Sequence, residues 1–199
     1  MQNRSPRLAR SIQTLSALLG ALVIGACGSS TSTTTGTHHA ASRRASVTSP
    51  QTVPLPCAGT RLALTFVGTQ GATGHLEATF ALSNASGTMC TLRGYPGARL
   101  LDAAGHIIAM HLKRGGGFFP DTISPPRRVV LAPSASARFG LSFVTNNEYA
   151  DARRCVVATA LESAPPGGTG TLRVALTGAG RPRITPCGNQ LVISPVYTG

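Results

Sequence analysis

Apolar and polar residues alternate along several short stretches of the chain, with the two-residue period of a strand that has one buried face. Residues 62–66 and 76–82 both alternate in this way, and a glycine-containing turn at 71–74 lies between them. The arrangement predicts a half-buried antiparallel hairpin. Its polar positions, Glu77 among them, are expected on the solvent side.

Further alternating or short apolar runs predict more strands, at residues 99–101, 106–112, 129–131, 139–143, 155–161, 172–176 and 191–196. Turn residues separate these runs and no segment keeps a helical period, although residues 146–149 fit either one helical turn or a loop. Trp is absent, and 23 glycines and 14 prolines favour turns over long helices. The pattern therefore predicts an all-β fold, a two-sheet antiparallel β-sandwich.

The first 26 residues differ from this pattern and have the features of an export signal. Three arginines precede an apolar stretch at 15–26 that is too short to span a bilayer. The stretch ends in Ile24-Gly25-Ala26-Cys27, which resembles the bacterial lipobox. The resemblance implies cleavage after Ala26 and a diacylglyceryl group on Cys27, with a plain signal peptide or an uncleaved anchor as the alternatives.

Residues 27–54 are a predicted tether between the lipidated cysteine and a domain at 55–199. Thirteen of the 29 residues between Gly28 and Pro56 are Ser or Thr, and none is acidic. Such a stretch cannot bury enough apolar surface to offset the entropy of ordering it. We therefore expect the tether to be disordered.

Five cysteines are an odd number for an exported chain, but lipidation of Cys27 leaves four that can pair. Cys57 and Cys90 lie almost symmetrically about the 71–74 turn, so the hairpin would bring them to one end of the sheet. Cys155 and Cys187 remain for the second disulfide.

The pairing of Cys155 with Cys187 is consistent with the turn at 165–168 rather than required by it. No cysteine or histidine spacing is typical of a zinc site. We expect neither a metal nor another cofactor.

Several segments of the domain occur, in the same order, in a known family. The most specific is Cys90-Thr91-Leu92-Arg93-Gly94-Tyr95-Pro96, and shorter pieces are Leu82-Ser83-Asn84-Ala85-Ser86, Leu101-Asp102-Ala103-Ala104-Gly105, Val130-Leu131-Ala132-Pro133 and Cys187-Gly188-Asn189. On these segments the chain resembles actinobacterial secreted proteins and lipoproteins of the domain-of-unknown-function four-two-three-two family. The resemblance implies an immunoglobulin-like β-sandwich outside the membrane and no established activity. Ser134 is a departure, because such proteins commonly have Gly after the Ala-Pro turn.

Physical roles can be proposed for two residues of the most specific segment. Gly94 permits a positive φ, and Tyr95 can pack its ring while its hydroxyl caps a backbone group. A binding role for Tyr95 is the alternative.

Basic residues outnumber acidic ones by 18 to 6, which gives a formal charge of +12. Loss of the three signal-peptide arginines leaves an excess of nine positive charges, which still attracts anions. Export argues against nucleic acid as a partner, and basic pairs such as Arg127-Arg128 lack an aromatic stacking series. Anionic lipid or an acidic envelope polymer fits better, and the alternative is an arginine-rich surface without a ligand.

The loop at 113–120 contains three glycines followed by Phe118 and Phe119. Two adjacent rings cannot point to one face of a strand. Either one ring is exposed in a contact patch, or both close one end of the sandwich; we favour the second arrangement.

Candidate catalytic residues are few. Asp102 could orient His106 toward a serine, but no serine lies in Gly-x-Ser-x-Gly or Ser-x-x-Lys. The six acidic residues are spread over the chain, which argues against a paired-carboxylate hydrolase. We expect no enzymatic activity.

The sequence therefore predicts a lipid-anchored β-sandwich on the extracytoplasmic face of the cell membrane, acting as a non-catalytic binding or envelope-associated module. The alternatives are a structural spacer without a ligand and, less favoured, an extracytoplasmic hydrolase. The sequence specifies neither the ligand nor the oligomeric state.

Overall fold

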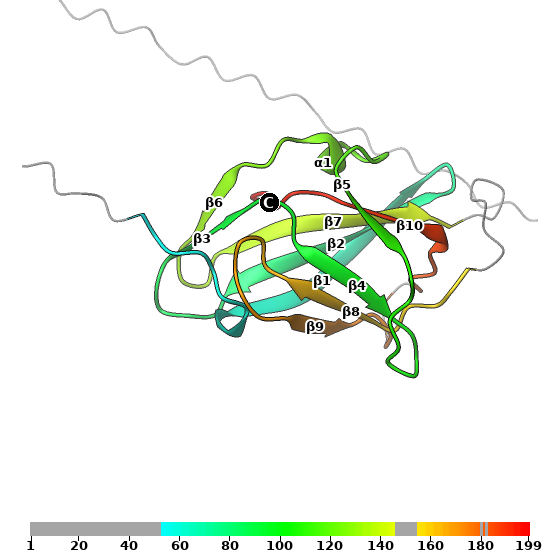
Figure 1. The fold of residues 1–199 in the computed structure, drawn as a ribbon, viewed down its shortest axis with the longest axis horizontal. Coiled ribbons are helices and arrows are strands. Elements are labelled where there is room, and N and C mark those ends of the chain that lie inside the picture. The colour runs from blue at the N-terminus through cyan, green and yellow to red at the C-terminus, as the bar shows by residue number, and fades with distance from the viewer. Residues whose placement is uncertain (1–52, 146–154, 180, 182) are drawn as a thin grey trace, which may run out of the picture. The chain divides into compact units, whose positions relative to one another are not determined.

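The computed structural model of the chain describes residues 53–145, 155–179, 181 and 183–199. They belong to one compact unit, Ser49–Gly199, which is an all-β fold (Figure 1). The predicted signal peptide, Cys27, the tether up to residue 52 and the helical turn or loop at 146–149 lie outside the described residues. Among those described, no helix has the length and apolar character needed to cross a membrane.

The largest sheet contains five strands in the order β1-β2-β7-β10-β5. Their bounds are β1 Leu62–Ala72, β2 His75–Asn84, β7 Ser136–Val144, β10 Cys187–Ile193 and β5 His111–Arg114. The pairs within this sheet are antiparallel except β10 with β5, which run parallel. This parallel pair departs from the antiparallel sandwich that the alternation predicts.

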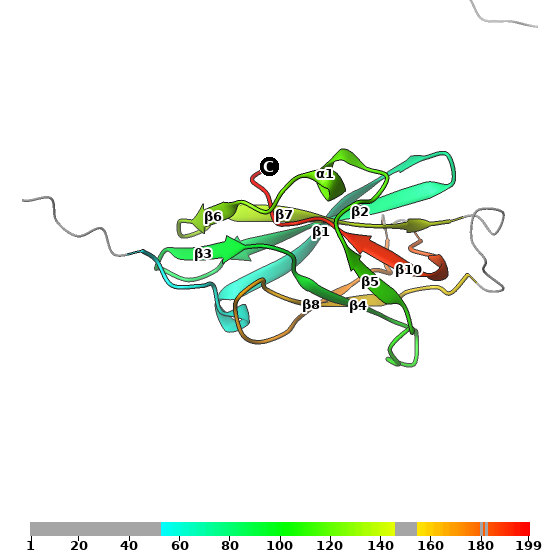
Figure 2. The same cartoon turned by 45° about the horizontal axis from the view of Figure 1, so that its top comes forward.

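The second layer consists of a three-stranded sheet and a two-stranded ribbon (Figure 2). The sheet has the order β4-β8-β9, with β4 Gly97–Leu101, β8 Ala160–Ala164 and β9 Leu172–Ala175, and the ribbon pairs β3 Cys90–Arg93 with β6 Arg128–Leu131. Short helices occur at η1, Gly59–Arg61, and α1, Pro120–Ile123. Both layers contribute side chains to the core.

The core contains large side chains that are almost completely buried. Phe80 of β2 and Phe139 of β7 stack with ring centroids 5.4 Å apart, and Leu92, Leu100 and Leu161 of the second layer join the same cluster. All members of the cluster come from residues 57–196. The unit Ser49–Gly199 therefore has a hydrophobic core of its own, as a domain does.

The predicted hairpin is confirmed as β1 and β2. Its turn consists of two residues, Thr73 with φ 49° and Gly74 with φ 76°. Positive φ at both central positions is the geometry of a type I′ turn, whose twist matches that of the flanking strands.

Both predicted disulfides are present, Cys57–Cys90 and Cys155–Cys187, with Cα–Cα distances of 4.9 and 4.1 Å. The first holds the segment that precedes η1 against β3. The Cys57 N–H donates to the Thr91 carbonyl, and the Thr91 N–H donates to the Leu55 carbonyl, each at 2.9 Å. The chain thus begins its described course alongside the β3–β6 ribbon.

Several element boundaries differ from the predicted ones. The run at 106–112 yields only β5 at its end, because the Asp102 carboxylate accepts the N–H groups of Ala104 and His106 and holds a turn there. The run at 155–161 yields β8 five residues later, with only isolated bridges at Cys155 and Ala158. The strand predicted at 191–196 runs from Cys187 to Ile193, and β3 was not predicted.

The expectation that Glu77 faces solvent is wrong, since its side chain is 0% exposed. Glu77 lies on the outer face of the large sheet, opposite Ser142 of β7, and α1 lies over that face (Figure 2). The neighbouring residue of β7 on this face is Gly140, where an added Cβ would lie 2.6 Å from Glu77 Oε2. The missing side chain of Gly140 provides the space that Glu77 occupies.

Candidate functional site

A hollow of about 470 Å³ opens where the ladder between β7 and β10 is interrupted. Cys187 pairs with Val144, and Val192 pairs with Ser142. Between these two pairs, β10 advances by five residues while β7 advances by only two. The three additional residues form a bulge that separates the two strands, and the separation leaves the hollow. We call it the His75 cleft.

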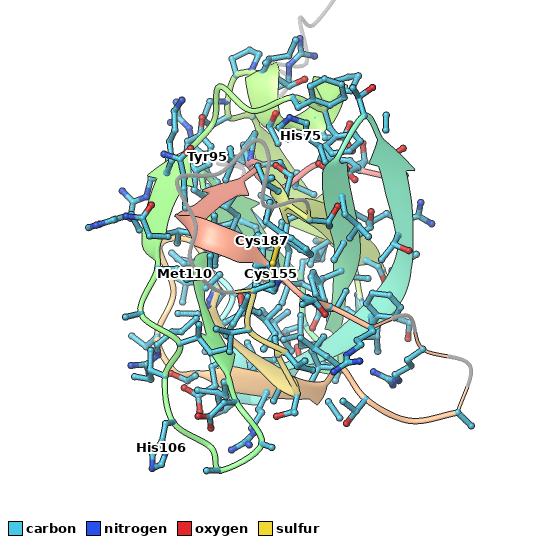
Figure 3. All side chains as sticks on the ribbon, turned by 90° about the vertical axis from the view of Figure 1, so that its right-hand side faces the viewer. His75, Tyr95, His106, Met110, Cys155 and Cys187 are labelled. Carbon is cyan, nitrogen blue, oxygen red and sulfur yellow. A yellow bond between two sulfur atoms is a disulfide. The ribbon has the colours of Figure 1, made fainter. Side chains whose placement is uncertain are left out.

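Polar groups line much of the His75 cleft. They include the side chains of His75, Ser142, Asn189 and Gln190, while Phe118 and Val192 supply apolar surface. Figure 3 shows the molecule from the side that carries His75 and the Cys155–Cys187 disulfide. No Asp, Glu, Lys or Arg is among the residues found to line this cleft in the described part of the chain.

Phe118 and Phe119 point in different directions, so the arrangement with both rings closing the sandwich is wrong. Phe119 is 6% exposed and precedes α1, where its carbonyl accepts the Thr122 N–H at 3.0 Å. Phe118 is 54% exposed and stacks on His75, with centroids 4.6 Å apart and planes 2° apart. The alternative that one ring is exposed is confirmed, because adjacent residues in extended backbone point to opposite sides.

A second hollow, of about 340 Å³, lies between α1, the start of β6 and the C-terminal residues. Arg127 and Arg128 line it together with Asp121 and Tyr197, and we call it the Arg127 cleft. Tyr197 has a pKa above its usual value because it is desolvated by burial and hydrogen-bonded to the Asp121 side chain.

Arg128 has a second arginine directly across the ribbon, since Arg93 of β3 is its register partner. Both are exposed, as is Arg127. The ion pairs found among the described residues are Arg99 with Glu162 and His106 with Asp102, so none of these three arginines is paired there.

Exposed apolar residues surround the same ribbon. Val130 of β6 is the register partner of Thr91, Met89 precedes β3, and the Leu55 carbonyl accepts the Thr91 N–H. Each of these apolar residues is at least half exposed, and so is Val53 near the same place. The three arginines and these apolar residues together form what we call the ribbon surface.

Tyr95 packs partly against the core, and Gly94 has the expected positive φ, at 107°. The Tyr95 hydroxyl lies beside Gly115, where an added Cβ would come within 2.9 Å of it. No hydrogen bond from this hydroxyl to a backbone group occurs in the described part of the chain, so the predicted cap is wrong. Residue 134 also has a positive φ, like Gly94, since Ser134 has φ 65°. Glycine adopts this conformation without strain, which explains why the family commonly has glycine at this position.

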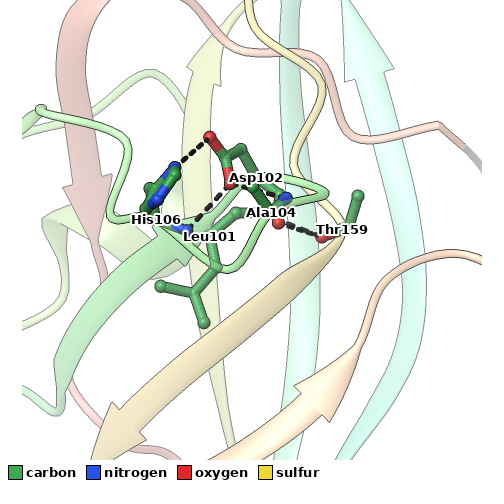
Figure 4. Close-up of polar contacts among 5 residues, drawn as sticks. All are labelled: Leu101, Asp102, Ala104, His106 and Thr159. Carbon is green, nitrogen blue, oxygen red and sulfur yellow. Dashed lines mark hydrogen bonds and ion pairs between the residues drawn. The ribbon is translucent and has the colours of Figure 1, made fainter.

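Asp102 and His106 do lie together, in an exposed turn (Figure 4). His106 Nδ1 is 3.5 Å from Asp102 Oδ2, and the other carboxylate oxygen accepts two backbone N–H groups. These backbone bonds lower the pKa of Asp102, which is the behaviour of a carboxylate that holds a turn. Among the described residues no serine is hydrogen-bonded to His106.

Among the described residues, no three His, Cys, Asp or Glu side chains gather as they would around a metal ion. The four cysteines there are all in disulfides.

The sequence did not identify Arg93, Asn189 or Gln190 as site residues, and its alternation assigned Glu77 to the solvent side. Arg93 lies in the most specific sequence segment, but its proximity to Arg128 depends on the register of a strand that the pattern did not predict. The cleft residues of β10 depend on a bulge, which leaves no mark in the alternation of the sequence.

The described residues form a disulfide-braced all-β domain with open clefts on its surface. The family model described as Domain of unknown function (DUF4232) matches residues 57–197, and the chain belongs to this family. Comparisons with curated proteins and with solved structures find no match.

Proposed function

We propose that the protein is a lipid-anchored, extracytoplasmic binding module that docks on anionic membrane lipid through the ribbon surface. The observation that carries the proposal is the cross-strand pair of Arg93 and Arg128, next to Arg127 at the mouth of the Arg127 cleft. Like charges directly opposite each other destabilise a pair of strands. An anionic headgroup between them would offset that repulsion.

The apolar part of the ribbon surface favours a membrane over a soluble anion. Three apolar side chains near Thr91 are exposed, those of Val130, Met89 and Leu55. Leu92, which follows Thr91 in β3, is instead buried in the core. Exposed apolar side chains beside basic ones are the combination that binds the boundary between headgroups and acyl chains.

The course of the first described residues also supports docking through the ribbon surface. Residues 54–57 run beside β3, so the segment that leads back to Cys27 joins the domain at the ribbon surface. A lipid on Cys27 would keep this surface near the bilayer, and the two disulfides fit an oxidising compartment outside the cytoplasm. Replacing Cys27 with Ala should abolish acylation, which intact-mass analysis of the processed protein can check.

The docking itself is tested with the segment Ser49–Gly199, which lacks the anchor. Binding to phosphatidylglycerol-containing vesicles and to pure phosphatidylcholine vesicles is compared by co-sedimentation. We expect binding only to the anionic vesicles. It should weaken sharply when salt is raised from about 0.05 to about 0.5 M, which shortens the Debye length from about 14 to about 4 Å.

Variants separate the ribbon surface from the general positive charge. Each basic residue at an anionic surface contributes about 1 kcal/mol, so Arg127→Ala with Arg128→Ala should weaken binding about tenfold or more. The control, Arg173→Ala with Arg183→Ala, removes the same charge from exposed sites outside the ribbon. Equal losses of affinity in both double variants would indicate a general electrostatic effect and not a specific ribbon surface. No binding to either kind of vesicle would leave a spacer without a ligand as the remaining alternative.

An acidic envelope polymer is the competing partner. Salt-sensitive binding to purified polymer, with no binding to anionic vesicles, would replace the lipid in this proposal. A contribution of Val130 distinguishes the two, because Val130→Ser should weaken binding to vesicles and leave binding to a hydrated polymer unchanged.

A further inference from the structure

We propose that the His75 cleft is a binding site for a neutral, polyhydroxylated ring, that is, a sugar residue. The site is independent of the lipid docking proposed above. It is a hollow of about 470 Å³, which lies within the size range of small-ligand sites.

The described lining residues favour a neutral ligand. The Arg127 cleft carries two arginines, whereas the residues found to line the His75 cleft include no Lys, Arg, Asp or Glu. A phosphate or a carboxylate would lose its hydration there and gain only the solvent-screened charge of Lys113, whose Nζ donates to the Gly116 carbonyl at 3.2 Å. An organic cation would gain no counter-charge from the described lining residues. A neutral ligand has no such penalty.

The polar groups of the lining suit hydroxyls in particular. Asn189 and Gln190 each carry one carbonyl acceptor and two N–H donors, and Ser142 adds a hydroxyl. A sugar hydroxyl both donates and accepts, so it can use both ends of a carboxamide. Gln190 is held in place because its backbone is in register with His111 of the parallel strand β5.

An aromatic surface stands beside these amides. Phe118 is stacked on His75 and meets Phe119 edge-on at 5.3 Å, so its ring has a fixed orientation although it is 54% exposed. An exposed ring held in this way costs little side-chain entropy on binding. The apolar C–H face of a sugar ring can pack on it while the hydroxyls at the ring edge face the amides.

The His75 cleft and the Arg127 cleft share no lining residue, so the two functions can be tested separately. The His75 cleft is also distant from the Leu131 end of the ribbon. His75 begins β2, and Asn84 at its other end donates to the Leu131 carbonyl of β6. Nine steps of extended strand correspond to about 30 Å. Changes at Phe118 should therefore leave vesicle binding unaltered.

The test is a titration of ¹⁵N-labelled Ser49–Gly199 followed by NMR. The probes are the methyl glycosides of glucose, mannose and N-acetylglucosamine, with inorganic phosphate and trialanine as comparators. We expect saturable shift changes at residues 116–118 and 188–190 with at least one glycoside, and none there with phosphate or trialanine.

Two variants and a control connect the shifts to the cleft. Phe118→Ala and Gln190→Ala should each weaken glycoside binding about three- to tenfold. Ile107→Ala, which truncates an equally exposed apolar residue in the turn region after β4, should leave it unchanged. The absence of saturable shifts with every glycoside, binding of trialanine or phosphate in the cleft, or unaltered affinity in both cleft variants would overturn the assignment.

Discussion

Gly140 lies in the interior of β7, directly against the side chain of Glu77, and its replacement by Ala tests how tightly the outer face of the large sheet is packed. A Cβ at residue 140 would lie 2.6 Å from both Cδ and Oε2 of Glu77. Non-bonded carbon atoms normally approach to about 3.5–4.0 Å, so the substitution demands a displacement of about 1 Å.

Neither partner can move easily. The Gly140 N–H donates to Ser194 Oγ at 2.8 Å, and its carbonyl accepts the Ser194 N–H at 2.9 Å. Glu77 is fully buried, and its Oε1 accepts a hydrogen bond from Gln70 Nε2 at 2.8 Å. Overpacking at such a site costs about 1–3 kcal/mol, which corresponds to a fall in Tm of about 2–12 °C for a domain of this size.

The assay is thermal and urea unfolding of Ser49–Gly199 with its disulfides intact, followed by circular dichroism. The control is Gly68→Ala in β1, because a Cβ there would meet no atom within 4 Å. Adding Glu77→Ala to Gly140→Ala removes the clash, so the double variant should lose less stability than the sum, by about 0.5–3 kcal/mol. Additive losses, or a Gly140→Ala variant as stable as Gly68→Ala, would refute the packing argument.

Two further predictions concern stability. Burial raises the pKa of Glu77 above its usual 4.5, so the folded state binds this proton more tightly than the unfolded state, and stability falls as pH rises from about 4.5 through the raised pKa. Glu77→Gln should flatten this part of the stability–pH profile, and an unchanged profile would contradict the assignment. Replacing Cys57 and Cys90 together with Ser opens a loop with a sequence separation of 33 and should cost about 3–4 kcal/mol. It should also increase hydrogen exchange at the Thr91 amide, and equal protection in both proteins would show that residues 54–57 hold to β3 without the disulfide.

The strands that could be predicted from the sequence are those in which every second side chain is apolar and enters the core. This holds for residues 62–66 of β1 and for β7, so alternation located both strands, although Gly140 and Ser142 on the other face of β7 are buried as well. In β3, Cys90, Thr91 and Leu92 are all buried, because the ribbon partner and residues 54–57 flank this short strand. Continuous burial over so few residues has no period, and the pattern could not reveal it.

The buried state of Glu77 was unpredictable for a related reason. Alternation identifies the face of a strand that is polar, but it does not show whether a later segment will cover that face. Here α1 covers it, and α1 is a single turn that begins at Pro120 without a helical period in the sequence. The one local signal was Gly140, since a glycine in the interior of a strand often marks the close approach of another group.

The proposed sites differ in how much of each the sequence contains. Arg127-Arg128 is visible as a dipeptide, and only its partner Arg93 required the register. Among the cleft residues, the sequence predicts an exposed phenylalanine ring in one of its two arrangements of Phe118 and Phe119. It does not predict that the Phe118 ring stacks on His75, 43 residues earlier in the chain. Contacts of that separation depend on the fold and not on the local pattern.

The Cys155–Cys187 disulfide acquires a more specific role once the cleft is considered. Cys187 is the last residue of β10 in register with β7 before the bulge, and it also lines the His75 cleft. Beyond the bulge, the parallel pairing with β5 from Gln190 onward fixes the other side. A bulge secured at both ends can keep two strands apart without loosening the sheet. The disulfide therefore stabilises the opening between β7 and β10 as well as the fold, and the interrupted ladder lies where a ligand could use it.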